Sequence, residues 1–215
     1  MDGLTYTYVV SEFISSIVSV SRFNKLNRPL KVFTLYISLA ALVDTVEIVY
    51  AGYAKNNVWM VNILNLLDGI VFLYIILTWS GFKLYLQYWL SISFVYLLYW
   101  TYSTLMNDAM NVFNSQQQSI KGLALILLSG ISIFRIINYE KDFVWKDHRV
   151  IILSAILIYY FVTLFPYLTS MIVLNNHEYG MNINWSVVLI TGTFASILFT
   201  IGILCFDPRK NTFLY

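Results

Sequence analysis

Four carboxylic acids fall inside long apolar stretches of the sequence: Glu12, Asp44, Glu47 and Asp68. A charged side chain in hydrocarbon costs about 2.5–3.5 kcal/mol on insertion scales, so such residues usually bind something or carry charge. Carboxyl groups at this depth bind a proton, a metal cation or a protonated amine, or they bridge two helices as protonated hydrogen-bond donors. Both interpretations stay open for these residues. Asn65, three residues before Asp68, would be a polar neighbour of the site.

The spacing of the four acids places three of them at one depth. Glu12, Asp44 and Asp68 each lie near the middle of the apolar stretch that contains them. Glu47 follows Asp44 by three residues, so it projects to nearly the same side of a helix, one turn further out. We therefore expect the polar faces of three neighbouring helices to meet in one hydrated or ligand-filled space.

The sequence offers no obvious counter-charge for these acids. Lys121 falls at the outer end of its apolar stretch, and Arg135 lies near the cytoplasmic end of the same stretch, where its side chain would snorkel to the interface. No lysine is expected near the middle of a span, which excludes a retinal photoreceptor that needs one for its Schiff base. The acids are thus expected to hold protons or to pair with a cation from outside the chain.

Composition identifies the environment in which these residues must work. Of 215 residues, 59% are apolar or aromatic and only 11% are charged, whereas soluble domains carry about 25% charge. A lipid bilayer is therefore the expected partner of the outer surface. The net charge of +2 is small and no basic cluster is interleaved with aromatic residues, so nucleic acid is not an expected partner.

Seven apolar stretches are long enough to cross a bilayer, which takes about 20 residues in a helix. We predict an all-α fold, a polytopic integral membrane bundle of seven transmembrane helices in a single domain covering residues 1–215. The expected spans are 4–21, 30–54, 58–80, 84–106, 119–139, 150–174 and 181–206.

Loop charges predict the orientation of the bundle. Eleven lysine and arginine residues fall on one side of the expected spans, and only Lys55 and Lys121 fall on the other. Basic loops stay in the cytoplasm, so the amino terminus is expected outside and the carboxyl terminus in the cytoplasm. The tryptophans agree, because all six lie toward the ends of their stretches, where amphipathic rings are favoured.

Residues that usually mark an enzyme are scarce. His148 and His177 are expected at opposite membrane faces, so they cannot share a metal, and Cys205 is the only cysteine. We expect no enzyme activity, no metal site and no cofactor. Pro166 lies within the sixth span, where its missing N–H is expected to kink the helix. Such a kink acts as a gating hinge in some proteins and is only a tolerated irregularity in others.

Two functions fit these residues. The first is a small transporter or channel in which Glu12, Asp44 and Asp68 bind a proton, cation or protonated amine, with Glu47 on the outer approach. The second is a ligand sensor that signals through a separate cytoplasmic protein. That protein would dock on the basic segment made up of Arg135, Lys141, Lys146 and Arg149.

Loose motifs along most of the chain give it a resemblance. They are Asn56–Asn57–Val58–Trp59 followed by Asn62–Ile63 and Asp68, then Leu157–Ile158–Tyr159, and the run from Asn184–Trp185 to Thr200–Ile201–Gly202. In these residues the chain resembles a group of small seven-helix membrane proteins from Bacteroidota that have no assigned activity. The resemblance implies seven helices and a location in the bacterial inner membrane.

Overall fold

The protein is a bundle of long helices. The computed structural model describes residues 3–53, 57–81, 84–106, 114–139, 146–174 and 178–208. Across these ranges there is no strand, which confirms the predicted all-α class. The helices are α1 (Gly3–Ser21), the 3₁₀ turn η1 (Phe23–Lys25), α2 (Arg28–Gly52), α3 (Val58–Trp79), α4 (Tyr85–Met106), α5 (Ser115–Tyr139), α6 (His148–Leu174) and α7 (Glu178–Cys205).

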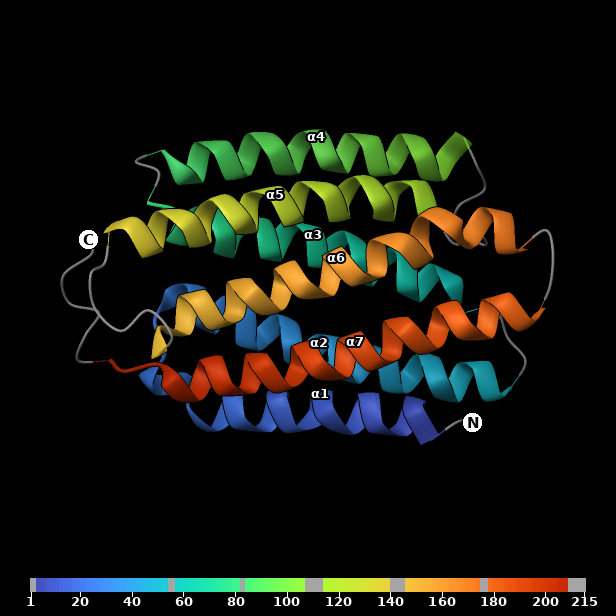
Figure 1. Ribbon diagram of the computed structural model, residues 1–215, viewed down its shortest axis with the longest axis horizontal. Coiled ribbons are helices and arrows are strands. Elements are labelled where there is room, and N and C mark those ends of the chain that lie inside the picture. Colours follow the sequence, from blue (N-terminus) through green and yellow to red (C-terminus); the bar gives the residue numbers. More distant parts are fainter. Residues whose placement is uncertain are drawn as a thin grey trace.

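Five of the helices are long and apolar enough to cross a membrane: α2, α3, α5, α6 and α7. Their outward side chains are largely leucine, isoleucine, valine and phenylalanine, a surface that water would not solvate and lipid would. The structure is thus that of a helical membrane protein. The remaining long helices, α1 and α4, run alongside these five in the same bundle (Figure 1).

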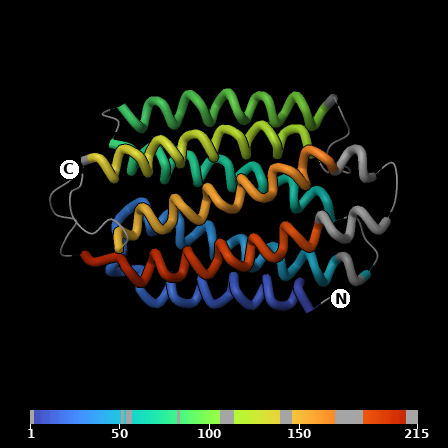
Figure 2. The backbone as a smooth tube through the Cα atoms, viewed as in Figure 1, coloured from blue at the N-terminus to red at the C-terminus, as the bar shows by residue number. Residues whose placement is uncertain are grey.

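Six helices form a closed ring in which α1 packs on α2, α2 on α3, α3 on α5, α5 on α6, α6 on α7 and α7 on α1. Helix α4 lies outside this ring against α3, as Figure 1 shows at the top of the view. Helix α1 begins at one end of the bundle and α7 finishes at the other, which the tube in Figure 2 makes easy to follow. The ring therefore encloses one shared interior between its two ends.

The two halves of that interior differ in composition. At the end where α2 begins and α3 finishes, the interior is a dense apolar core that includes Phe33, Ile76, Ile152 and Ile203. Arg22 closes this end, because its guanidinium donates to the last carbonyls of α7, including that of Ile203 at 2.7 Å. From mid-length toward the opposite end, the buried side chains become polar.

Helix boundaries differ from the expected spans chiefly at α5. The helix begins at Ser115, four residues before the expected start at 119, because the Asn114 side chain accepts the N–H of Gln117 at 3.1 Å and caps it. The starts of α6 and α7 also lie a few residues early. As a consequence Lys121 is inside α5 and not at its outer end.

Candidate functional site

Tyr8, Glu12 and Asp44 form the first of two polar clusters, which we call the acid cluster. The Tyr8 hydroxyl lies 2.5 Å from Glu12 Oε1 and 2.8 Å from Asp44 Oδ2. Tyr8 and Glu12 share one face of α1 at a spacing of four residues, and α2 brings Asp44 against that face. Both carboxyl groups are buried.

Counting hydrogens shows that the acid cluster needs a proton. A phenol has one O–H, so Tyr8 can donate to Glu12 or to Asp44 but not to both at once. The same phenol oxygen contacts both carboxyl groups, so one of these two contacts has to take its hydrogen from a carboxyl group. Two ionised carboxylates in these contacts would repel, whereas one carboxylic acid O–H supplies the missing donor. The geometry thus fits a carboxyl pair that shares a proton.

The acid cluster has unused acceptor capacity. Among the described residues, no donor forms a hydrogen bond with Oε2 of Glu12 or with Oε1 of Glu47, although both oxygens are buried. Glu47 lies one turn beyond Asp44 on α2, is half-buried, and interacts electrostatically with Asp44. A buried acceptor without a donor costs about 1–3 kcal/mol, so these oxygens favour binding of a further proton or of a ligand that donates hydrogen bonds.

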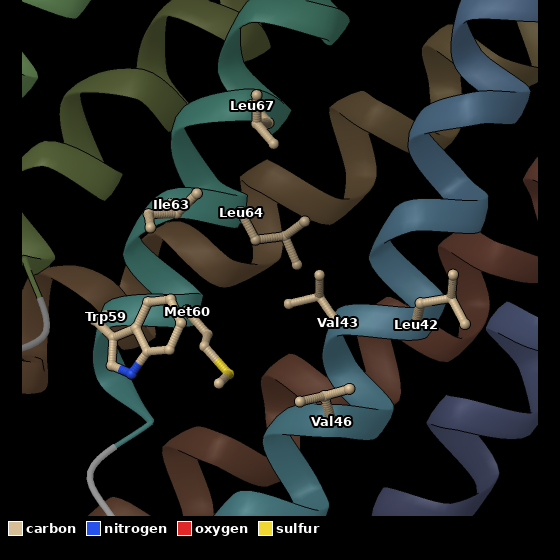
Figure 3. A pocket seen from close by; sticks show the side chains of 8 residues that line it. All are labelled: Leu42, Val43, Val46, Trp59, Met60, Ile63, Leu64 and Leu67. Carbon is tan, nitrogen blue, oxygen red and sulfur yellow. The ribbon is translucent and has the colours of Figure 1, made fainter.

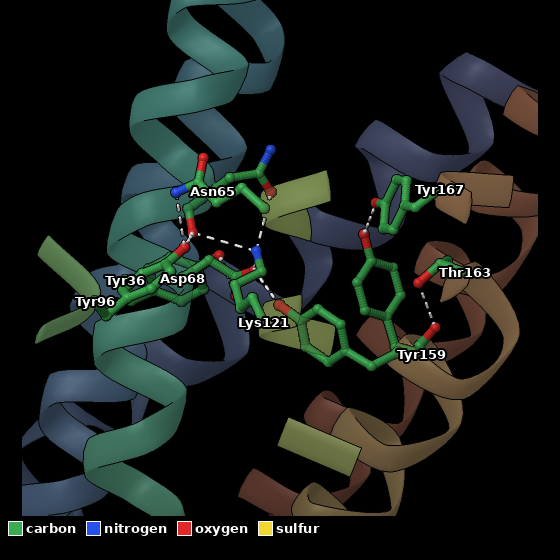
Figure 4. Close-up of polar contacts among 10 residues, drawn as sticks. Tyr36, Asn65, Asp68, Tyr96, Lys121, Tyr159, Thr163 and Tyr167 are labelled. Carbon is green, nitrogen blue, oxygen red and sulfur yellow. Dashed lines mark hydrogen bonds and ion pairs between the residues drawn. The ribbon is translucent and has the colours of Figure 1, made fainter. Parts of the chain in front are cut away.

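Asp68 belongs to a second cluster, the ion-pair cluster, which has the opposite character. Its Oδ2 accepts a hydrogen bond from Lys121 Nζ at 2.8 Å and another from the Tyr160 hydroxyl, and its Oδ1 accepts one from the Tyr36 hydroxyl at 3.1 Å. Lys121 also donates to the backbone carbonyl and the side-chain oxygen of Asn65, at 3.2 and 3.3 Å. Figure 4 shows Lys121 reaching between Asn65 and Asp68. Both oxygens of Asp68 and the Lys121 ammonium thus have hydrogen-bond partners.

The presence of Lys121 corrects the prediction that no basic residue lies at the depth of the acids. The sequence placed this lysine at the outer end of its span, but α5 starts earlier and the side chain points inward along the bundle. Its side chain is only 3% exposed, and that of Asp68 only 8%. A spacing rule within one helix could not have found this pair, because the partners are 53 residues apart on different helices.

The predicted site residues thus come together in two groups. Asp44 and Asp68 interact electrostatically, and Tyr36 connects the groups because it comes from the same helix as Asp44 and contacts Asp68. Tyr159 of α6 interacts electrostatically with both carboxyl groups and its hydroxyl lies 3.4 Å from that of Tyr167. These tyrosines were not predicted as site residues, since the sequence has 17 of them and only the fold distinguishes these few.

Two glycines allow side chains of these clusters to lie flat against a helix. A Cβ at Gly192 of α7 would come within 2.7 Å of the Tyr8 ring, and one at Gly69 of α3 within 2.8 Å of the Tyr96 ring and 3.1 Å of Lys121 Cδ. Atoms this close would clash. Gly192 therefore fixes the position of Tyr8, and Gly69 leaves room for the Lys121 chain to reach Asp68.

Two cavities lie along α2 and α3, and none of the four acids lines them. The larger is a groove of about 280 Å³ between α2 and α3, lined only by apolar side chains (Figure 3). Its residues are Leu42, Val43, Val46, Trp59, Met60, Ile63, Leu64 and Leu67. A second, of about 220 Å³, lies further along the same two helices and includes Tyr36 but none of the four acids. Among the described residues, no group of three or more His, Cys, Asp or Glu side chains is placed to hold a metal ion.

The remaining predicted residues have varied surroundings. Pro166 is buried inside α6, which continues past it to Leu174. In the basic segment, Lys146 is exposed, whereas the Arg149 guanidinium pairs with Asp147 at 2.6 Å. Arg135 is half-buried on α5. Lys141 lies outside the described residues.

Comparison with known proteins leaves the function to be argued from these contacts, since the chain matches no protein-family model, no curated protein and no solved structure at a significant level.

Proposed function

We propose that this chain is a small membrane transporter or channel whose acid cluster carries a proton across the bilayer interior. The observation that supports it is the hydrogen count at Tyr8, Glu12 and Asp44, where one phenol oxygen contacts both carboxyl groups and supplies only one hydrogen. A site of this kind changes its charge by gaining or losing a proton, and buried titratable groups inside spans are typical of proton relays.

The surroundings of the acid cluster favour movement of the proton over a purely structural bridge. Unused oxygens on Glu12 and Glu47 extend along α1 and α2 toward the polar end of the interior. Tyr36 and Tyr159 each interact electrostatically with both Asp44 and Asp68, and the Tyr36 hydroxyl donates to Asp68. A proton therefore has successive oxygen sites within the ring, whereas the apolar core at the opposite end blocks the path in this conformation.

The proposal includes the topology. We place all seven long helices across the membrane, because α1 and α4 run parallel to the five apolar ones (Figure 1) and α1 contributes half of the carboxyl pair. The basic loops put the amino terminus outside and the carboxyl terminus in the cytoplasm. With this orientation the polar end faces outward and the apolar core inward. The bacterial inner membrane is the proposed location.

Proton flux in proteoliposomes tests the function. We expect an imposed pH gradient or membrane potential to acidify pyranine-loaded vesicles faster with the protein than without it, in sodium, potassium or ammonium salt. Glu12→Gln and Asp44→Asn should each abolish the increase. Asp147→Asn makes the same chemical change outside the spans and should leave it intact. Flux equal to that of empty vesicles, or flux that survives both substitutions, would contradict the proposal.

The alternative is a sensor that signals through a cytoplasmic protein docked on the basic segment. Among the described residues no comparable observation favours it, because Arg149 is already held by Asp147. A cytoplasmic protein that co-purifies with the chain and is lost on changing Lys141, Lys146 and Arg149 to Gln would replace the first proposal with this one.

A further inference from the structure

The surroundings of Lys121 Nζ have the chemistry of a binding site for a primary ammonium group. The three N–H bonds of the ammonium match three acceptors: Oδ2 of Asp68 at 2.8 Å and two oxygens of Asn65 at 3.2 and 3.3 Å. The ring of Tyr160 lies with its centroid 5.3 Å from Nζ, close enough for a cation–π contact. A carboxylate, two carbonyl oxygens and an aromatic ring thus surround one cation.

The path taken by the rest of the Lys121 side chain fits an unbranched alkyl chain. Its Cδ passes over Gly69, at a position where a Cβ on α3 would be only 3.1 Å away. The Tyr96 ring borders the same position. The site thus recognises two features together, an ammonium group with three hydrogens and a slender aliphatic tail.

Lys121 is anchored toward the polar end of the bundle. Its Cα is six residues from the start of α5 at Ser115, so the side chain points from its anchor inward to Asp68. A lysine released from Asp68 can extend the other way, along its own helix toward the interface, as long basic side chains do near helix ends. Release of Lys121 from Asp68 thus requires its side chain to rotate toward the polar end of the bundle.

We propose that Asp68, Asn65 and Tyr160 form a binding site for protonated primary alkylamines, and that Lys121 occupies it as a tethered competitor until such an amine displaces it. The inference rests on the proposed transport function, to which it adds the substrate class. Displacement puts an amine beside Asp68, where the electrostatic interaction between Asp68 and Asp44 links amine binding to the proton held by the acid cluster.

The tether sets the expected affinities. A side chain attached by a short flexible linker competes as if it were free at a millimolar concentration. Wild-type protein should thus bind n-propylammonium saturably but weakly. Lys121→Ala removes an alkylammonium of the same length as the probe, so this variant should bind n-propylammonium at least about tenfold more tightly.

Calorimetric titration of the full chain in detergent micelles tests the assignment, with n-propylammonium chloride as the probe and tetramethylammonium chloride as the matched cation without N–H groups. We expect n-propylammonium to bind wild type weakly and Lys121→Ala tightly. Lys121→Met, which lacks the charge but keeps a side chain of similar length over Gly69, should bind less tightly than Lys121→Ala. Asp68→Asn combined with Lys121→Ala should not bind at all.

Several outcomes would overturn the inference. One is no saturable binding to Lys121→Ala, and another is tetramethylammonium binding as tightly as n-propylammonium. Binding to Lys121→Ala with none to wild type would make Lys121 a permanent occupant of a structural ion pair. Should Lys121→Ala fail to fold, the ¹³Cε NMR signal of Lys121 in wild type serves instead, assigned by its loss in Lys121→Met. It should shift to the position of an exposed lysine as n-propylammonium is added, and a signal that stays in place contradicts displacement.

The calorimetric result is separable from that of the flux experiment. Amine binding without proton flux removes the transport function and leaves the ammonium site. Proton flux that depends on Glu12 and Asp44, without amine binding, retains the transport function and removes amines as its substrates.

Discussion

The acid cluster and the ion-pair cluster both contain buried carboxyl groups and tyrosines, but they differ in how the carboxyl groups are supplied with hydrogen-bond donors. Asp68 receives three donors, one of which is a cation, so its charge is balanced inside the bundle. Glu12 and Asp44 share one phenol donor, and no described lysine or arginine contacts them. A buried carboxyl group that is paired with a cation has its charge balanced within the bundle, whereas one short of donors must take up a proton. The number of donors, more than depth in the membrane, thus separates Asp68 from Glu12 and Asp44.

The largest expected effect is on stability at the ion-pair cluster. Asp68→Asn or Lys121→Met leaves one buried charge without its partner and should lower the free energy of unfolding by about 3–5 kcal/mol. The double variant removes both charges and should recover most of that loss. Asp44→Asn puts an amide donor next to Glu12 and should change stability by about 1 kcal/mol or less. Denaturant titration in micelles measures all four, and equal losses for Asp68→Asn and Asp44→Asn would contradict the distinction between the clusters.

The clusters should also differ in how stability depends on pH. Above about pH 4 the unfolded chain releases a proton that the folded acid cluster keeps, so stability falls as pH rises from there until the cluster itself loses the proton, by up to about 1.4 kcal/mol per pH unit. In the Glu12→Gln variant the amide group supplies the hydrogen, so no shared proton is needed and the slope of stability against pH should flatten. Asp68→Asn combined with Lys121→Met should keep it. Denaturant midpoints measured across the neutral to alkaline range check this, and a slope that survives Glu12→Gln would place the titrating group elsewhere.

Glycine substitutions disturb each cluster separately. Gly192→Ala drives a methyl group against the Tyr8 ring and Gly69→Ala drives one against Tyr96 and Lys121, so each should lower the free energy of unfolding by about 1–3 kcal/mol. At Gly122 the nearest atom to an added Cβ is Tyr160 Cδ1 at 3.5 Å, an ordinary contact, and Gly122→Ala is the matched control with little change or a slight gain.

Activity should distinguish the two disruptive glycine variants. Gly192→Ala moves the phenol that bridges the carboxyl pair and should reduce proton flux. Gly69→Ala acts on the Lys121 path and should mainly weaken alkylamine binding. Equal effects of both on flux, measured at matched amounts of folded protein in the vesicles, would show that the clusters do not act separately.

The smallest expected effect lies outside the spans, at Asp147. Burial alone raises the pKa of Asp147, but the hydrogen bonds and charge of Arg149 outweigh it and hold this pKa below its ordinary value. The stability it contributes is thus present at neutral pH and lost as pH falls through the lowered pKa. Asp147→Asn keeps an oxygen for the Arg149 N–H but loses the ion pair with the Arg149 guanidinium, so it should cost about 1 kcal/mol or less, and denaturant titration should show that cost shrinking in acid. If the stability cost of Asp147→Asn grew in acid instead, the assignment of a lowered pKa to Asp147 would be wrong.

The sequence predicted the helical class, the approximate position of each long helix and the burial of Glu12, Asp44 and Asp68, because apolar length and isolated acids are local signals. It did not predict which acids meet, since that depends on which helices adjoin in the ring. Lys121 was misplaced because the cap at Asn114, which starts α5 early, left its side chain inside the bundle. Tyr8 and Tyr160 were not predicted as site residues for a related reason. The sequence contains many tyrosines, and it does not distinguish those at the membrane interface from those in the interior of the bundle.

Infrared spectroscopy of the carboxyl groups at neutral pH shows which cluster holds the proton, because a protonated carboxyl has a C=O stretch that a carboxylate lacks. We expect a protonated-carboxyl band that Glu12→Gln combined with Asp44→Asn removes in part, and that Asp68→Asn combined with Lys121→Met leaves unchanged. A band that persists when Glu12 and Asp44 are replaced, yet is lost when Asp68 and Lys121 are replaced, would show that the proton resides in the other cluster and would contradict the account.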